Sequence, residues 1–483
     1  MLPLSHAGVP ATPAHTSCSP PPSVGQVRPI PRNGDPDRPE DGAHGDPAQP
    51  PAPGWKAPAR PGLAQRKELP PAAWEQEQGH NKEPSTEWAQ PQATAPAPSR
   101  SVSLLPLASG RYSVAEGRGR KGPGIWPPHV YTENEIAKIP AHTFLGLPNL
   151  EWLDLSKNKL DAQGLHPHAF KNLTRLKRLN LDGNSLSTVP ALPTSLQELK
   201  LNDNLLQGLQ HSSFQGLSQL LTLEVEGNQL HDGNISPLAF QPLRSLVYLR
   251  LDRNQLRTIP PGLPASLQEL HLSTNAIEEV SEGALNRSRN LRVLVLSNNR
   301  LQEDRLAPRA WIDLPKLETL DLSHNRLVHV PSFLPRGLRH LTLHHNRIER
   351  IPGYVFAHMK PGLEFLHLSH NSLGADGIHS VSFLGLHASL AELLLDHNQL
   401  QAIPRGLLGL RRLQVLRLSH NKIRYVPLNS ICDTRVAQDS NLISTHLENN
   451  LIDRRRIPPT AFSCIRAYHS VVLQPQQGEG EGS

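Results

Sequence analysis

One spacing, LxxLxLxxNxL, recurs from Leu150 to near the C-terminus and constrains the fold of this 483-residue chain more than any other feature. A repeat period of about 20 to 29 residues is typical of a leucine-rich-repeat solenoid. We therefore expect a horseshoe of about 13 full repeats. The asparagines of the repeat are Asn158, Asn184, Asn204, Asn228, Asn254, Asn275, Asn299, Asn325, Asn346, Asn371, Asn398, Asn421 and Asn450.

Each repeat contains a short xLxL segment that is predicted to be a β-strand. Alternation along a strand sends its leucines to one face and the intervening residues to the other, so stacked repeats form a parallel sheet with one apolar side. One repeat alone cannot bury its leucines and needs its neighbours. The asparagine follows the strand, where its amide can pair with backbone groups that the turn would leave buried and unbonded. Its predicted role is structural.

The repeats differ in length, and each short repeat is followed by two longer ones. The short ones read "VPALPTSLQELKLNDN", "IPPGLPASLQELHLSTN" and "VPSFLPRGLRHLTLHHN". Proline fixes an extended backbone, so the convex side is expected to be polyproline-like, with brief helical turns only on the longer repeats.

Composition divides the chain into three parts. Residues 1–125 are rich in Pro, Ala, Gly, Gln and charge, and we expect them to be disordered for want of apolar surface to bury. We assign residues 126–473 to the repeat domain and 474–483 to a second disordered tail. In a degenerate first repeat, Trp126, His129 and Tyr131 take leucine positions and Asn134 takes the asparagine position.

Charge and motifs exclude several classes of function. The net charge of +6 is mildly basic and fits an acidic polymer such as a sulfated glycan, or simply a solvated surface. Both signs are spread along the chain, which gives no nucleic-acid signal. We find no nucleophile elbow, phosphate loop, HExxH or CxxC, so neither an enzyme nor a cofactor is predicted. No stretch approaches the roughly 20 apolar residues of a membrane span.

Two of the three cysteines, Cys432 and Cys464, bracket the last irregular repeat. A disulfide between them would stabilise that end of the solenoid by roughly 3 to 4 kcal/mol and suits an extracellular protein. Two reduced thiols in a cytosolic protein are the alternative. The first 20 residues lack the apolar core of a signal peptide, so we expect that this N-terminus is not that of the secreted form.

The repeat cadence, the proline-rich short repeats and the ending "LSHNKIRYVPLNSICD…LENNLIDRRRIPPTAFSCIRAYHSVVL" together resemble the small leucine-rich-repeat proteoglycans over about residues 131–473. In that family the penultimate repeat is drawn out into an ear closed by a two-cysteine cap. Cys432, Cys464 and the long interval from Asn421 to Asn450 match this pattern, which places the ear at about 428–466. The resemblance implies a secreted matrix protein. The family's four-cysteine cluster before the first repeat is not present.

The outer face of the sheet is the first candidate binding surface, because a solenoid presents it as a long preformed array. The resemblance implies that collagen docks there; the alternative is that any such sheet displays solvated polar residues. The candidate residues are Glu151, Trp152, Asp154, Arg178, Asn180, Lys200, Tyr248, Arg250, Arg253, Glu269 and His271.

A column of histidines precedes the repeat asparagine in five consecutive repeats, with His340, His344 and His367 nearby. Adjacent strands lie about 4.8 Å apart, so protonation below roughly pH 6.5 would stack like charges. Zinc binding by these histidines is a more specific hypothesis. However, "LSHN" is a common sequence at these positions of the repeat and specifies no tetrahedral ligand set, so no metal site is predicted. The column is His324, His345, His370, His397 and His420.

Glycans supply the remaining candidates. The sequons at Asn172, Asn234 and Asn286 all fall after a strand, where a glycan would not obstruct stacking. Basic clusters that match sulfate chemistry, and so heparin or heparan sulfate, are Arg118, Arg120 and Lys121, and Arg454, Arg455 and Arg456. Two functions follow: a secreted matrix protein that binds collagen or another matrix protein, or an intracellular scaffold that recruits a protein partner.

Overall fold

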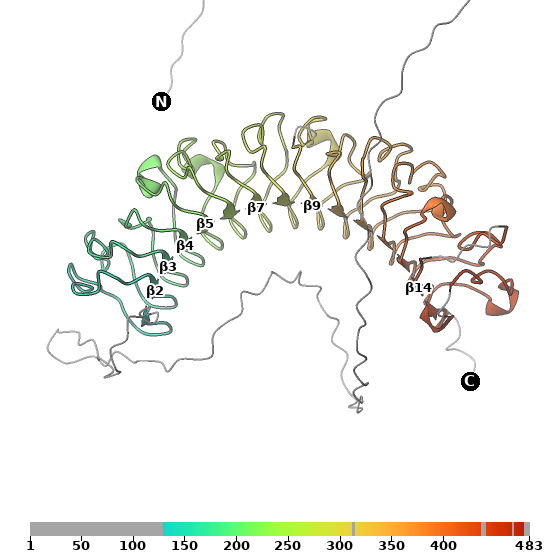
Figure 1. Cartoon of the computed structure of the whole chain (residues 1–483), viewed down its shortest axis with the longest axis horizontal. Coiled ribbons are helices and arrows are strands. Elements are labelled where there is room, and N and C mark those ends of the chain that lie inside the picture. Colours follow the sequence, from blue (N-terminus) through green and yellow to red (C-terminus); the bar gives the residue numbers. More distant parts are fainter. Residues whose placement is uncertain (1–128, 312–313, 436–440, 466–467, 478–483) are drawn as a thin grey trace, which may run out of the picture. The chain divides into compact units, whose positions relative to one another are not determined.

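The computed structural model describes residues 129–311, 314–435, 441–465 and 468–477, all within the unit Thr94–Ser483. The fold is a stack of short strands, one for each repeat (Figure 1). These strands are β1 His129–Val130, β2 Trp152–Asp154, β3 Arg178–Asn180, β4 Glu198–Lys200, β5 Thr222–Glu224, β6 Tyr248–Arg250, β7 Glu269–His271, β8 Val293–Val295, β9 Thr319–Asp321, β10 His340–Thr342, β11 Phe365–His367, β12 Glu392–Leu394, β13 Val415–Arg417, β14 Ser444–His446 and β15 Val471–Val472.

The strands form one parallel sheet in which each strand pairs with the next along the chain. The register aligns equivalent positions, so that Leu153 lies opposite Leu179 and Leu179 opposite Leu199. In Figure 1 the described repeats follow a curve with the strands along its inner side. The predicted leucine-rich-repeat solenoid, with its sheet on the concave face, is confirmed.

Leucines form the core because every three-residue strand points its middle side chain inward. Leu199, Leu249 and Leu320 are fully buried, as are leucines one position beyond the strands such as Leu201 and Leu251. Full burial of a leucine contributes roughly 1.5 to 3 kcal/mol. Each repeat gains this only when a neighbour covers it, which is why the stack has to be continuous.

The repeat asparagines hold the turns that follow the strands. The Asn325 amide donates to the carbonyl oxygens of Leu296, Leu322 and Ser323, each at 3.0 Å, and its Oδ1 accepts from the backbone N–H of Leu301 at 3.0 Å. Two of these bonds, to Leu296 and from Leu301, therefore join the preceding repeat, and the other two close the turn of its own repeat. The asparagines are structural, as predicted.

Among the described residues the connections between strands contain 3-10 turns and other hydrogen-bonded turns but no α-helix, which confirms the expectation of brief helical turns. Phenylalanines from neighbouring repeats stack beneath the convex side, with ring centroids 6.1 Å apart for Phe144 and Phe170 and 6.5 Å apart for Phe214 and Phe240. The 3-10 turns are η1 His211–Phe214, η2 Asp232–Asn234, η3 Glu303–Arg305, η4 Leu407–Gly409, η5 Arg454–Arg456 and η6 Tyr468–Ser470.

The first repeat has the register that the sequence predicts. His129 pairs with Leu153, and Tyr131, in the next leucine position, is 7% exposed. The Asn134 amide donates to the Thr132 carbonyl oxygen at 2.8 Å. Trp126 and the predicted disordered segment 1–125 lie outside the described residues.

The solenoid continues beyond residue 473, whereas the composition predicts a disordered tail over 474–483. Strand β15 adds a repeat that lacks the asparagine of the consensus. Gln476 replaces it: its Nε2 donates to the carbonyl oxygens of Leu447 (2.9 Å) and Leu473 (2.7 Å), and its Oε1 accepts from the Ile452 N–H (3.0 Å). The longer glutamine side chain performs the asparagine's role, and the asparagine-based pattern missed it. Residues 478–483 lie outside the described part.

Candidate functional site

The outer face of the sheet is built by the first and third residues of each strand. In β2 the side chain of Trp152 is exposed, Leu153 is buried and Asp154 is half-buried. The same alternation holds along the sheet, so equivalent residues of successive repeats form columns. The predicted surface residues within the strands therefore share one face.

Charges on this face pair across repeats. Glu151, one residue before β2, accepts from Lys177, and Asp154 accepts from the Asn180 amide at 3.3 Å. Each carboxylate meets its partner on an adjacent strand or just before it, because the parallel register brings equivalent positions together. The pairs in this group are Lys177–Glu151 at 2.9 Å, Arg178–Glu198 at 3.3 Å and Lys200–Glu224 at 3.0 Å.

A second charged network surrounds β6. Arg250 contacts Glu226 at 3.0 Å and Asp252 at 2.8 Å, and Arg253 contacts Glu226 at 2.7 Å and Asp203 at 2.8 Å. Arg253 was predicted on the strand face, and this placement is wrong. The strand ends at Arg250, and Arg253 lies in the following turn with φ of 50°, in the position that histidines take in later repeats.

An aromatic contact links β6 to β7. The rings of Tyr248 and His271 lie 5.0 Å apart between centroids, and His271 Nε2 lies 3.7 Å from a carboxylate oxygen of Glu269. The 3.7 Å separation is too long for a hydrogen bond. Burial raises the pKa of Tyr248 to about 12, so this phenol is neutral at physiological pH.

Sequence reasoning overlooked the second half of the face. From β8 onward the outward positions become more apolar, with Val293 and Val295 on β8, Phe365 on β11, Leu394 on β12 and Val415 on β13, all half-buried. The signal was present, since these residues occupy the same xLxL positions. The face therefore gains apolar residues in its second half, among charged ones such as Asp321, Glu392 and Arg417.

The histidine column forms a stack in the structure. Its five members have φ between 51° and 54°, the left-handed region, where short polar side chains are enriched. The centroid distances are 4.2 Å for His324–His345 and 4.1 Å for His345–His370, His370–His397 and His397–His420, with interplanar angles of 9° to 16°.

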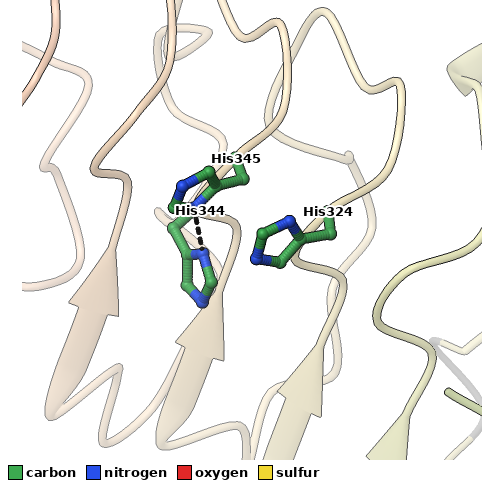
Figure 2. A group of neighbouring side chains, drawn as sticks. All are labelled: His324, His344 and His345. Carbon is green, nitrogen blue, oxygen red and sulfur yellow. Dashed lines mark hydrogen bonds between the residues drawn. The ribbon is translucent and has the colours of Figure 1, made fainter. Parts of the chain in front are cut away.

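His344 lies against this stack at nearly right angles (Figure 2). Its ring makes interplanar angles of 88° with His324 and 80° with His345, and the centroids are 5.0 Å apart in both cases. The Nδ1 atoms of His344 and His345 are joined by a hydrogen bond and lie 2.7 Å apart. One nitrogen from each of the three rings lies within 4.8 Å of the others, so the structure brings together a potential metal-ligand set that the sequence alone did not specify.

Burial and neighbouring imidazoles oppose protonation here. Burial, and then His367 and the stack, lower the pKa of His344 to about 3. Burial, and then His370 and His324, lower the pKa of His345 to about 4. Burial is also the main cause that lowers the pKa of His367 to about 4. His345 therefore takes up a proton well below the pH 6.5 expected from the sequence.

The glycan candidates occupy separate parts of the surface. Asn286 is exposed, whereas Asn172 and Asn234 are half-buried. Asn234 accepts from the His231 N–H at 2.8 Å and donates to the Gln229 carbonyl oxygen at 3.0 Å, so a glycan on its amide would compete with a turn.

Of the two basic clusters, only the second lies within the residues that the structure describes. Arg118, Arg120 and Lys121 lie outside the described residues. Arg454, Arg455 and Arg456 are exposed in η5. Because a 3-10 helix has three residues per turn, these side chains leave the turn in three directions.

The cap is closed by a disulfide between Cys432 and Cys464, with Cα atoms 5.5 Å apart. Cys432 is buried, and its sulfur accepts from the Cys464 N–H at 3.2 Å. Of the predicted ear at 428–466, residues 436–440 and 466 are outside the described part. No helix among the described residues has the length and apolarity that a bilayer crossing requires.

Comparison with known proteins agrees with this architecture. The family model "Leucine rich repeat" matches residues 132–190, 194–256, 265–327 and 336–400. In solved structures, the chain is similar to one in an octameric complex of Latrophilin 3, Unc5D and FLRT2 (LRR), with 29% identity, a TM-score of 0.52 and coverage of 55% of this chain and 80% of that one. A Leptospira interrogans LRR protein gives 25% identity and a TM-score of 0.51, over 67% and 84% of the two chains.

Relatives in sequence narrow the assignment. Human podocan-like protein 1 is 34% identical over 71% of this chain and 66% of its own length, and mouse podocan is 36% identical over 73% and 57%. The chain thus spans less than two thirds of these relatives. Chicken lumican is 33% identical over 61% of this chain and 84% of its own. The chain belongs to the leucine-rich-repeat proteins and, within them, to the small leucine-rich proteoglycan family of podocan, keratocan and lumican.

Proposed function

We propose that this chain is a non-enzymatic, secreted protein of the extracellular matrix that binds collagen or another matrix protein through the outer face of its sheet. The carrying observation is the face from β2 to β7, where exposed Trp152 stands beside a continuous series of paired charges. A rod-like partner with alternating charge matches such a face over several repeats.

Two further observations support this proposal. The Cys432–Cys464 disulfide suits an oxidising compartment. The spacing of the ear and cap resembles that of the matrix members of the family, and we propose a kinship with extracellular matrix protein 2 in particular. An intracellular scaffold would keep both cysteines reduced. Non-reducing peptide mapping of protein taken from cells separates the two functions.

A direct test measures binding of the purified chain to immobilised fibrillar collagen. Arg178→Glu places a second carboxylate beside Glu198, and Trp152→Ala removes the exposed indole. Each is expected to weaken binding about tenfold or more, as truncation of an interface anchor does. Arg309→Glu, at an exposed position between β8 and β9, is the matched control and should bind as the unaltered chain does. Equal binding by all variants would remove this face from the proposal.

Glycans are secondary parts of the proposal. Heparin-like chains would contact Arg454, Arg455 and Arg456, and because these side chains diverge, binding should be modest and sensitive to salt. Replacement of all three by serine should shorten retention on heparin, measured by the salt concentration at elution. N-glycans are proposed at Asn172, Asn234 and Asn286, and a mass decrease after endoglycosidase treatment of cell-derived protein tests them.

A further inference from the structure

We propose that His324, His344 and His345 form a binding site for a divalent transition-metal ion of the Zn²⁺ type. All three side chains lie just beyond the ends of β9 and β10, and their ligand nitrogens are within 4.8 Å of one another (Figure 2). Imidazole nitrogen is a preferred ligand of zinc, and three protein ligands with an open fourth position is a common zinc arrangement.

The histidine stack alone does not make this site. Parallel rings such as His370 and His397, 4.1 Å apart, repeat along the column without converging on a point. His344 changes the geometry because it crosses both His324 and His345 nearly at right angles. It occupies a position that neighbouring repeats fill with serine, as at Ser323 and Ser369. The double histidine of "LTLHHN" thus adds a third ring to a pair that already stands in register.

The backbone beneath these rings is held firmly. His324 N–H donates to the His344 carbonyl oxygen at 2.9 Å, and His345 N–H donates to the Ser369 carbonyl oxygen at 3.1 Å. Asn346, the next residue, donates to the carbonyl oxygens of Leu322 and Leu343 at 3.0 Å. Only side-chain rotation is left to adjust, so a metal would meet ligands whose main chain is already placed.

The required rotation is small for His344 and His345, and the His324 nitrogen, within 4.8 Å of theirs, has to approach to the same spacing. Zinc–nitrogen bonds of about 2.0 to 2.1 Å at tetrahedral angles separate the ligand nitrogens by about 3.3 Å. The Nδ1 atoms of His344 and His345 now lie 2.7 Å apart, and a cation seated between them would take the place of the hydrogen that they share. The proton of the donating ring would move to its own Nε2 through solvent, so each ring stays neutral as it binds.

The surroundings leave a fourth position for another ligand. His324 and His345 are exposed, so water can enter the site. The His367 ring lies 4.5 Å from that of His344, on the adjacent strand β11, and is a candidate for this fourth position. Asp321 on β9 accepts from the Ser323 N–H at 2.9 Å and supplies no ligand in this arrangement.

Isothermal titration of the full chain with ZnCl₂, without a histidine tag, tests the site. We expect one Zn²⁺ per chain. His344→Ser restores the serine of neighbouring repeats and should weaken binding at least tenfold, since even loss of a residue that only orients a ligand costs about 10- to 100-fold. His324→Asn should do the same and keep the fold, because Asn298 occupies the equivalent position with φ of 53°.

The matched control is His397→Asn, the same change in the same column but away from His344. It should bind Zn²⁺ as the unaltered chain does. Far-UV circular dichroism checks that each variant is folded. The proposal is overturned if the unaltered chain binds no Zn²⁺ at a metal concentration of about 100 micromolar, which is on the order of the dissociation constant of a weak site. It is also overturned if His397→Asn weakens Zn²⁺ binding as much as His324→Asn does.

Discussion

Replacement of Asn299 by alanine should destabilise the solenoid by about 3 kcal/mol. This side chain is 8% exposed. Its amide donates to the carbonyl oxygens of Leu272 and Leu296 at 3.0 Å and of Ser297 at 3.1 Å, and its Oδ1 accepts from the Ile277 N–H at 3.0 Å. Alanine removes two donated hydrogens and one acceptor, and each bond contributes about 1 kcal/mol net. The Ile277 N–H is then left buried without its partner. The carbonyl oxygens of Leu272, Leu296 and Ser297 keep a second bond, from Asn275, Asn325 and the Thr274 N–H.

The adjacent Asn298 provides the control. It is exposed, has φ of 53°, and makes a 3.1 Å hydrogen bond from its amide to the Thr274 hydroxyl. Asn298→Gly keeps the left-handed backbone, as Gly183 and Gly227 do in this position, and should cost no more than about 0.5 kcal/mol. Urea unfolding followed by far-UV circular dichroism gives both values from the shift in midpoint. If both variants shift the midpoint equally, the buried repeat asparagines do not hold the turns.

Three further predictions concern single positions. Burial is the main cause that raises the pKa of Asp182 from 3.8 to about 6, so its contribution to stability is present below pH 3.8 and is lost as the pH rises through 6; Asp182→Asn should therefore raise the melting temperature at pH 7.5 and leave it unchanged at pH 3.5. Joint replacement of Cys432 and Cys464 by serine opens a loop of 32 residues and should cost about 4 kcal/mol in urea unfolding, whereas an unchanged midpoint would show that the disulfide does not form. Gly385→Ala places a Cβ 2.1 Å from a backbone oxygen, so it should destabilise by about 2 kcal/mol more than Gly146→Ala, which has a similar φ but open space, and equal melting temperatures would contradict this.

Much of the fold could be predicted because every repeat has to bury its leucines and to satisfy the backbone groups of its turn in the same way. The spacing of leucine and asparagine reports which side chains are buried and which one bonds to the turn, and the Asn158 amide makes the expected bonds to Leu155 and Ser156. The last repeat escaped the pattern because Gln476 supplies the same bonds from a longer side chain.

The binding surface was less predictable. The sequence shows which positions are equivalent in successive repeats, but it does not show the side-chain rotamers. The rotamers decide which charged groups form ion pairs and which aromatic rings lie perpendicular to each other. Arg253 was misplaced because the strands are only three residues long, so the position after the second leucine already belongs to a turn. In the sequence His344 differs from neighbouring repeats only in replacing a serine, and the perpendicular orientation of its ring is visible only in the structure.

The mutual pairing of charges on the sheet has a consequence for recognition. A carboxylate such as Glu226, already held between Arg250 and Arg253, presents little uncompensated field to an approaching partner. Long-range steering should then be weak, and association should depend little on ionic strength. A specific ligand has to replace an ion pair within the sheet face by an equally favourable ion pair with itself. The face therefore selects partners by shape and by local charge complementarity, and long-range electrostatic attraction contributes little.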